Sequence, residues 1–239
     1  MIAVKDLYKG FGDLEILKGV DVHLLAGENL GILGKSGTGK SVLAKCIVRL
    51  LEPDYGSISV LGQDILAMNH VELNEIRKVI GYLFQGGALY DSMSVRENME
   101  FPIRRTQMAS QKDEVDGMVE RALRSVGLLD AIDKMPAELS GGMKKRIGLA
   151  RALILKPKVI LYDEPTTGLD SVTSGEISEL IVQVQEEYDA ASIIITHDMK
   201  CAQIATNRIK ILDDGVFIAE GTYKELSASS DKKIKAFFI

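Results

Sequence analysis

The pattern of hydrophobic and polar positions changes period several times along the chain, which predicts strands and helices in turn. Short apolar runs bounded by glycine or charged residues are typical of buried strands, and they cover residues 2–7, 15–25, 29–33, 57–61, 79–84, 158–162 and 192–196. Apolar positions with helical spacing occupy residues 41–51, 71–78 and 173–188. Two further short strands, at 209–212 and 216–219, flank Asp213-Asp214-Gly215 and predict a hairpin.

The middle of the chain has a different pattern. From about residue 94 to 155 strand character is lost, and helices are predicted within it at 111–126 and 141–155. Alternating strands and helices on either side predict an α/β fold, whose parallel sheet is covered on both faces. We therefore expect one domain over residues 1–226 with a helical subdomain inserted at about 88–156, followed by a short tail at 227–239.

A glycine-rich run, Gly34-Lys35-Ser36-Gly37-Thr38-Gly39-Lys40-Ser41, lies between a predicted strand and a predicted helix. Its glycines let backbone N–H groups turn inward, and the helix N-terminus adds positive potential at the same point. Lys40 can reach the terminal phosphates of a nucleotide, and the Ser41 hydroxyl can bind magnesium. The structural alternative is a flexible loop before an ordinary helix, and the motifs described below argue against it.

Two carboxylates end a predicted apolar strand. Asp163 and Glu164 directly follow Val159-Ile160-Leu161-Tyr162. Burying a charge is costly unless it is paired or bound to a metal, so an acid here, in a sheet that also carries a phosphate loop, predicts a magnesium site at Asp163. Glu164 is then placed to orient and deprotonate an attacking water. The structural alternative is a polar strand end before the turn that Pro165 favours.

Ser140-Gly141-Gly142 stands at the predicted start of the helix 141–155. Ser140 is a typical N-cap, and a capped amphipathic helix is the simple structural reading of the segment. That reading does not require two successive glycines, which destabilise a helix. Close approach of the backbone to a phosphate does require them. Gln85 and His197, like Asp163, directly follow predicted strands, so we expect them to share one edge of the sheet with the phosphate loop.

Composition narrows the classes of function. The 239 residues are sufficient for one large domain, and the net charge of −5 argues against a nucleic-acid-binding protein. No apolar run approaches the roughly 20 residues of a membrane-spanning helix. The first residues have neither a charged start nor an apolar core, so no signal peptide is expected. The two cysteines have no metal-ligand spacing and fit a cytosolic protein.

Taken in order, these motifs resemble those of the ATP-binding-cassette (ABC) ATPases. The elements are the phosphate loop 34–41, Gln85, the signature 139–143, Asp163-Glu164, Gly168-Leu169-Asp170 and His197. The resemblance spans nearly the whole chain and implies a phosphate-loop NTPase (RecA-like) core with an N-terminal antiparallel β subdomain and an inserted helical subdomain. It implies ATP and Mg²⁺ as ligands and ATP hydrolysis as the activity.

The resemblance also implies roles for individual residues. Glu164, His197 and Gln85 are the expected catalytic residues, and Ser41, Gln85 and Asp163 the expected magnesium ligands. Phe11 matches the aromatic residue that stacks on adenine. The alternative for Phe11 is a purely structural role in the core of the first hairpin, and Tyr8 is the second choice for the stacking role. The remaining expected nucleotide contacts are Gly34, Lys35, Ser36, Gly37, Thr38, Gly39, Lys40, Ser41, Val42, Ser140, Gly141, Gly142 and Asp170.

In the family, the signature binds the γ-phosphate of a nucleotide that the other subunit holds. The resemblance thus implies a homodimer with shared sites, and a cytoplasmic position at the inner face of the plasma membrane beneath an integral permease. We expect the permease to contact residues 85–105, where Met99, Arg104 and Arg105 are candidate contacts. No nucleic-acid partner is expected.

Several segments resemble the Mla/Mce phospholipid-transport ATPases, including Phe84–Val95 and the signature ending in Met143. Phospholipid or other hydrophobic cargo is therefore the favoured prediction. The alternatives are another small-solute ABC transporter, a soluble cassette such as an iron–sulfur scaffold ATPase, and an ATP-binding regulator, against which Glu164 argues. A small regulatory subunit is a further partner, although some Mla ATPases continue beyond the Phe237-Phe238-Ile239 end seen here.

Overall fold

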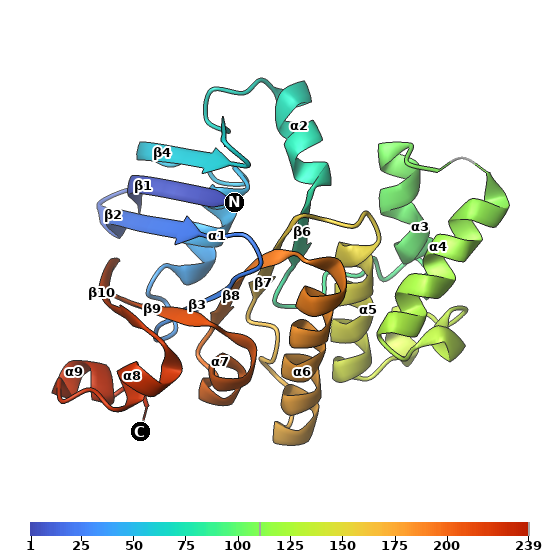
Figure 1. The fold of residues 1–239 in the computed structure, drawn as a ribbon. Coiled ribbons are helices and arrows are strands. Elements are labelled where there is room, and N and C mark those ends of the chain that lie inside the picture. Colours follow the sequence, from blue (N-terminus) through green and yellow to red (C-terminus); the bar gives the residue numbers. More distant parts are fainter. Residues whose placement is uncertain (110, 239) are drawn as a thin grey trace.

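Two β-sheets and a set of helices form the architecture seen in the computed structural model, which describes residues 1–109 and 111–238 (Figure 1). The larger sheet has the strand order β10-β9-β3-β8-β7-β6, and the smaller one has the order β2-β1-β4-β5. The strands of the larger sheet are β3 (Asn29–Leu33), β6 (Ile80–Leu83), β7 (Val159–Asp163), β8 (Ala191–Thr196), β9 (Arg208–Asp213) and β10 (Val216–Gly221). Those of the smaller sheet are β1 (Ile2–Phe11), β2 (Leu14–Leu24), β4 (Tyr55–Val60) and β5 (Gln63–Asp64).

The larger sheet is parallel from β6 to β9, and β10 closes its edge as the antiparallel arm of the predicted hairpin. Every residue of β3, β7 and β8 is buried. Such continuous apolar strands arise because a parallel sheet is covered on both faces. The carboxyl ends of β3, β6, β7 and β8 therefore meet at one edge, as predicted. The antiparallel N-terminal sheet that the family resemblance implied is also confirmed.

Opposite faces of the larger sheet carry different helices. α1 (Lys40–Ile47) packs with Val159, Leu161 and the smaller sheet in one core. α5 (Gly141–Leu153) and α6 (Ser171–Tyr188) pack on the alternate residues, Ile160 and Tyr162, in a second core. Successive side chains of a strand point to opposite faces, so the helix after the phosphate loop and the helix after the signature lie on different sides of the sheet.

The middle of the chain is helical, as expected. α3 (Val95–Thr106) and α4 (Lys112–Ser125) stand at the right of Figure 1 beside α5, and the short turns Leu129–Ala131 and Pro136–Glu138 follow. Ser94 and Glu97 form a capping box that starts α3. Met99 is fully buried in the helical core, so its prediction as a permease contact was wrong.

The remaining helices are α2 (His70–Lys78), α7 (Met199–Ala205), α8 (Tyr223–Ser227) and α9 (Lys232–Lys235). α1 ends at Ile47, earlier than predicted, because Arg49 turns into the left-handed region at φ 53°. α7 was not predicted. The tail is not extended: Ile234, Phe237 and Phe238 pack against a small core that includes Leu33.

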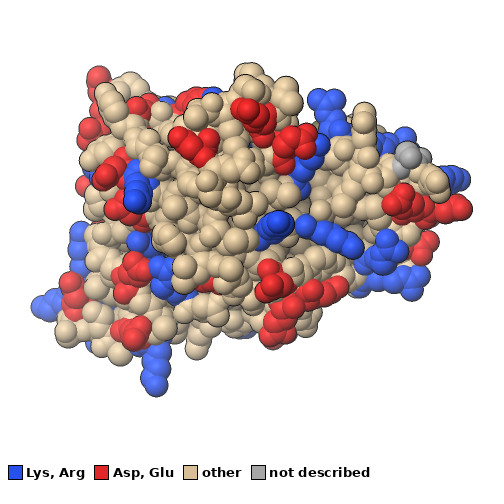
Figure 2. Space-filling model, turned by 45° about the horizontal axis from the view of Figure 1, so that its top comes forward, with Lys and Arg blue, Asp and Glu red and all other residues tan. Residues whose placement is uncertain are grey.

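Acidic and basic side chains are interspersed over the face drawn in Figure 2, and no broad patch of one sign covers it. Among the residues that the structure describes, none of the helices is long and apolar enough to cross a membrane.

Candidate nucleotide site

The phosphate loop has the geometry of an anion cradle. Gly37 and Gly39 have φ values of +83° and +101°, which favour glycine. A Cβ on Gly34 would lie 2.5 Å from the Leu212 carbonyl oxygen, so this position has no room for a side chain. Gly39 is the N-cap of α1 and offers no side-chain acceptor to the first N–H groups. These donors are free for an anion at the positive end of the helix.

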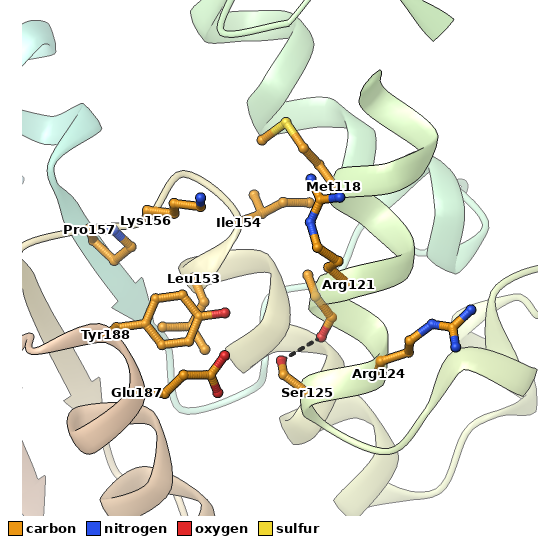
Figure 3. A pocket seen from close by; sticks show the side chains of 11 residues that line it. Met118, Arg121, Arg124, Ser125, Leu153, Ile154, Lys156, Pro157, Glu187 and Tyr188 are labelled. Carbon is orange, nitrogen blue, oxygen red and sulfur yellow. Dashed lines mark hydrogen bonds between the residues drawn. The ribbon is translucent and has the colours of Figure 1, made fainter. Parts of the chain in front are cut away.

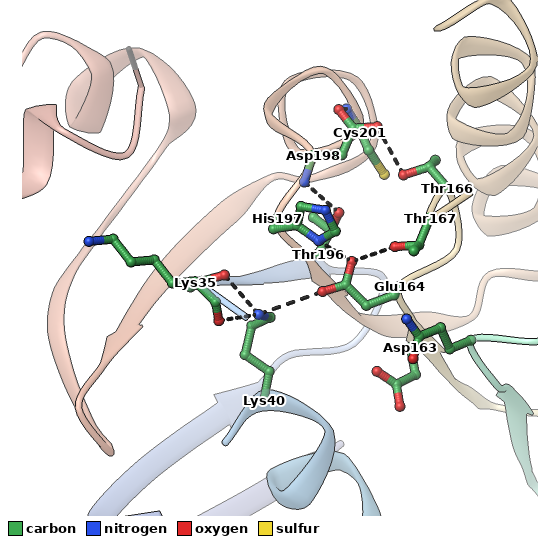
Figure 4. A network of polar contacts seen from close by, with 12 residues as sticks. Lys35, Lys40, Asp163, Glu164, Thr166, Thr167, Thr196, His197, Asp198 and Cys201 are labelled. Carbon is green, nitrogen blue, oxygen red and sulfur yellow. Dashed lines mark hydrogen bonds and ion pairs between the residues drawn. The ribbon is translucent and has the colours of Figure 1, made fainter. Parts of the chain in front are cut away.

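Lys40 is 5% exposed, and its ammonium group lies within this loop. Its Nζ atom donates to the carbonyl oxygens of Gly34 at 2.7 Å and Lys35 at 2.8 Å, and it lies 3.6 Å from Glu164 Oε1 (Figure 4). Burial lowers the pKa of Lys40, and the Glu164 carboxylate offsets part of that effect. The lysine is thus a buried cation at the base of the cradle.

Hard oxygen ligands gather beside the loop. The Ser41 hydroxyl donates to Asp163 Oδ1 at 2.8 Å, and the Tyr82 hydroxyl lies 3.3 Å from Asp163 Oδ2. Burial, together with the Asp163 charge, raises the pKa of Tyr82, which keeps its hydroxyl protonated as a donor. A hydroxyl in the first turn of α1 and a carboxylate at the end of β7 fit Mg²⁺, which takes few protein ligands when phosphates supply the others. The described residues contain no cluster of three or more His, Cys, Asp or Glu suited to a metal.

Glu164 occupies an unusual backbone conformation for a non-glycine residue, with φ at 52°. Its main-chain N–H donates to the Ile195 carbonyl at 2.8 Å. Its Oε2 atom accepts from Thr167 Oγ1 at 3.0 Å and lies 2.7 Å from His197 Nδ1 (Figure 4). The carboxylate therefore lies between the Lys40 ammonium and the His197 ring, where it can accept a proton from a water.

These residues surround a pocket of about 210 Å³, lined by Ile16, Ser36, Gly37, Gly39, Lys40, Ser41, Val42, Gln85 and Glu164. The structure thus brings together residues that lie more than a hundred positions apart in the sequence. Eight of the nine lining residues were predicted site residues. Ile16 was missed, because an apolar residue in a strand gives no chemical signal. Asp163 and His197 lie directly behind this lining, bonded to Ser41 and Glu164.

Phe11 lies outside the lining of this pocket. Its side chain is 50% exposed at the end of β1, with Lys9 Nζ 5.3 Å from the ring centroid. Tyr8 is 42% exposed and packs edge-on against Tyr55. Both rings are partly exposed to solvent. Stacking of Phe11 on adenine, with Tyr8 as the second choice, stays a prediction.

Ser140 is the N-cap of α5, and its hydroxyl accepts from the Met143 N–H at 3.2 Å, as predicted. A Cβ on Gly142 would lie 2.6 Å from Thr173 Cγ2, so close packing of α5 on α6 requires this glycine. Asp170 caps α6 by accepting from the N–H groups of Val172 and Thr173. The side-chain hydrogen bond from Thr173 lowers the pKa of Asp170. Ser140, Gly141, Gly142 and Asp170 do not line the pocket described above.

Lys145 was not predicted. It is 5% exposed, and its ammonium group donates to the main-chain carbonyls of Gln85 and Glu164. From the sequence, a lysine on an amphipathic helix is expected to lie at the surface. Its burial follows only from the packing of α5 against the strand ends.

A larger hollow, of about 710 Å³, lies elsewhere, between α4, the end of α5 and the end of α6 (Figure 3). Its lining includes Arg121, Arg124, Lys156 and Tyr188. Lys156 and Tyr188 precede the amino ends of β7 and β8, at the opposite end of the strands from the phosphate loop, and Arg121 and Arg124 come from α4.

Comparison with known families gives a consistent result. A family model described as ABC transporter matches residues 17–167. A protein of Mycobacterium leprae named "probable ribonucleotide transport ATP-binding protein mkl" is 40% identical over 236 residues, which cover 99% of this chain and 68% of that protein. The methionine import ATP-binding protein MetN of Clostridium tetani is 36% identical over 98% of this chain and 73% of its own length. The chloroplastic protein trigalactosyldiacylglycerol 3 of Arabidopsis thaliana is 36% identical over 99% and 73%.

Solved structures agree. The cassette MJ0796, captured as a dimer in a post-hydrolysis state with ADP and Pi, superposes with a TM-score of 0.86 at 31% identity, over 94% of this chain and all (100%) of that one. CbiO1 of Clostridium perfringens, described as part of the ABC transporter complex cbiONQ, superposes with a TM-score of 0.86 at 31% identity, over 99% of this chain and 94% of that one.

Proposed function

This chain belongs to the ABC transporter family and is an ATPase, and from that premise we propose that it powers a membrane permease that moves phospholipid or a similar hydrophobic cargo. The observation that carries the enzymatic part is the convergence of Lys40, Asp163, Glu164 and His197 at one edge of the parallel sheet. Phosphoryl transfer depends mainly on positioning and on charge stabilisation, and these side chains supply both.

We assign the roles from the geometry. Lys40 and the N–H groups before α1 bind the terminal phosphates. Ser41 and Asp163, together with Gln85 as the family resemblance implies, would hold Mg²⁺, which would neutralise charge on the phosphates. Glu164 accepts the proton of the attacking water, and His197 orients the Glu164 carboxylate through their 2.7 Å contact.

The second half of each site comes from a second copy of the chain. The signature helix α5 and the phosphate-loop helix α1 cover opposite faces of the sheet, and Ser140 does not line the pocket at Lys40. The dimer of MJ0796 supports a two-fold arrangement in which each copy offers Ser140, Gly141, Gly142 and Asp170 to the nucleotide of the other. ATP then closes the dimer, and loss of the γ-phosphate opens it.

The permease contact is a shallow groove beside α3. Tyr90 and Phe101 are 45% and 38% exposed, their rings lie 5.0 Å apart, and Arg151 covers the Tyr90 ring at 5.8 Å. Together with Pro102 and Leu155 they line a pocket of about 240 Å³. Exposed aromatic residues around an apolar groove suit the docking of a partner helix. The chain would thus lie at the inner face of the plasma membrane, held there by the permease.

The cargo rests on residues 84–95 and on Met143 in the signature, which resemble lipid-transport ATPases, and on the similarity to a protein named for a diacylglycerol glycolipid. The relatives named for ribonucleotide and methionine transport support a small-solute transporter as the second candidate.

The test is reconstitution. The chain is isolated together with its permease from detergent-solubilised membranes and placed in proteoliposomes. ATP-dependent movement of a labelled phospholipid, absent in Glu164→Gln, supports the lipid proposal. ATP-dependent uptake of labelled methionine or a ribonucleotide without lipid movement refutes it in favour of the second candidate. Failure of any permease to accompany the chain contradicts the transporter proposal as a whole.

A further inference from the structure

A buried lysine joins the signature helix to both catalytic strand ends. Lys145 lies on α5, five positions after Ser140, with 5% of its surface exposed. Its Nζ atom donates to the Glu164 carbonyl oxygen at 2.9 Å and to the Gln85 carbonyl oxygen. Gln85 follows β6 and Glu164 follows β7, so a single ammonium group bridges two neighbouring strand ends and the helix.

A buried ammonium group is costly, and its location calls for a reason. Within the described part of the chain, no ion pair joins Lys145 to a carboxylate; its partners are two main-chain carbonyls. An apolar side chain of similar length would fill the same space at lower cost, because it would need no compensating bonds. What a lysine adds is several N–H donors on one atom, which can hold two carbonyls in a fixed relation.

Those carbonyls belong to the residues whose placement governs the chemistry. The Glu164 N–H is already fixed by Ile195 of β8. Lys145 fixes the carbonyl side of the same residue, which has φ at 52°. With both peptide groups held, the carboxylate is directed toward Lys40 and His197. The same ammonium holds the main chain of Gln85, which is one of the residues that line the pocket.

We propose that Lys145 is a positioning residue for ATP hydrolysis, which fixes the backbones of Gln85 and Glu164 against the helix that carries Ser140, Gly141 and Gly142. The inference rests on the proposed roles of Glu164 and of the signature. Because α5 presents its N-terminus to the nucleotide of the second copy, a shift of α5 on dimer closure moves Lys145 and, with it, both carbonyls. Each site then becomes competent when the neighbouring copy is in place.

The test compares Lys145→Met with Lys144→Met in the full chain. Methionine keeps the length of the side chain and removes all three donors. Lys144 is the neighbouring lysine on the same helix, only partly buried, and its ammonium group makes no ion pair among the described residues. ATP affinity is measured with a fluorescent nucleotide analogue, kcat by phosphate release, and the melting temperature by circular dichroism.

We expect Lys145→Met to bind the analogue as the unchanged chain does, because the phosphate loop is untouched, and to lose kcat by about 10- to 100-fold, the usual effect of removing the outer support of a catalytic group. Lys145→Gln keeps one amide that reaches one carbonyl, so its kcat should fall between the two. Lys144→Met should retain its kcat. A structural role alone would lower the melting temperature without this split between affinity and kcat.

A Lys145→Met protein that folds and turns over ATP as fast as the unchanged chain overturns the proposal, as does an equal loss in Lys144→Met. If Lys145→Met does not fold, Lys145→Gln decides, and undiminished turnover there overturns it. Glu164→Gln is measured alongside. Full activity in Glu164→Gln refutes the proposed catalytic role of Glu164, whatever Lys145 does, so the two failures are distinguishable.

Discussion

At the scale of single residues, the site depends on one carboxylate held from several sides. Glu164 contacts the Lys40 ammonium, the His197 ring and the Thr167 hydroxyl, and its backbone is bonded to β8 and to Lys145. The contacts come from α1, from β8 and the residue after it, from α5, and from the loop that contains Glu164 itself. A residue held in this way needs no rearrangement when a water molecule arrives, which is how preorganisation lowers a reaction barrier.

Replacing Glu164 by glutamine should keep ATP binding and lower kcat by about 10²- to 10⁴-fold, because glutamine cannot accept the proton. Phosphate release measures the rate, and size-exclusion chromatography with ATP should show a trapped dimer. Glu179→Gln, an exposed carboxylate on α6, is the matched control. Turnover within a factor of two of the unchanged chain would remove Glu164 from the reaction.

Lys40→Ala should strongly weaken ATP binding, because it removes the buried cation that faces the phosphates and leaves the Gly34 and Lys35 carbonyls without their donor. The expected loss of affinity is at least tenfold, since a hydrogen bond to a charged group contributes about 1.5–3 kcal/mol. Isothermal titration with ATP measures it. Lys35→Ala is a useful comparison, and an unchanged affinity in Lys40→Ala would contradict the cradle.

At the scale of elements, the same few residues at the start of α5 serve two functions. Its first turn contains the signature, and the same turn packs on α6 so closely that Gly142 has no room for a Cβ. The sequence suggested that two glycines serve a phosphate alone. The structure gives Gly142 a packing reason as well, whereas Gly141 is exposed and has only Leu169 near its missing Cβ.

Gly142→Ala tests the packing reason. In the unchanged background it should lower the free energy of unfolding by about 1–3 kcal/mol, because an added methyl group is overpacked against Thr173 Cγ2. In a Thr173→Ser background, which removes that methyl group and keeps the hydroxyl that bonds to Asp170, the loss should shrink or reverse. Urea unfolding of the four proteins in the cycle measures the coupling. An equal loss in both backgrounds would show that Thr173 is not the obstacle.

At the scale of the whole molecule, the helices that follow the phosphate loop and the signature cover opposite faces of one sheet, and Ser140 does not line the pocket at Lys40, so the proposed active unit is a pair of chains. Ser140→Arg in the Glu164→Gln background should prevent the ATP-dependent dimer while the single chain still binds ATP. Light scattering with and without ATP measures the mass. Ser57→Arg, exposed on β4 of the smaller sheet, is the control. An undisturbed dimer in Ser140→Arg would contradict the shared site.

A second whole-molecule feature ties the two sheets together. Arg208 on β9 bonds to both oxygens of Glu28, which precedes β3, and also to the His23 carbonyl of β2. Burial raises the pKa of Glu28, but the bonds from Arg208 and the Leu25 N–H outweigh it, and the pKa lies below its ordinary value of 4.5.

The stabilisation is therefore complete above about pH 4.5 and is lost as the pH falls through the lowered pKa. Glu28→Gln should lower the free energy of unfolding at pH 7 by about 1–3 kcal/mol, the usual value for bonds between charged groups. The difference should diminish at more acidic pH. Urea unfolding at several pH values measures it, and a difference that is constant with pH would contradict the assignment.

Much of this arrangement was predictable, because the motifs follow apolar strands and parallel strands end at a common edge. Lys145, Ile16 and the packing of Gly142 on Thr173 were not predictable in the same way. Each depends on side chains from distant elements meeting in space, and neither periodicity nor residue type encodes such meetings. α7 was missed for a related reason, since its few residues owe their helix to the Asp198 cap and to contacts with α6 and β3.

The place of β3 has a consequence for biosynthesis. This strand, which carries the phosphate loop, is made within the first 33 residues, yet its hydrogen-bonded neighbours on both sides are β8 and β9, at residues 191–196 and 208–213. A ribosome must therefore complete most of the polypeptide before this strand can be enclosed. In an interrupted translation product the phosphate loop would not be formed, so the fragment could not hydrolyse ATP unproductively.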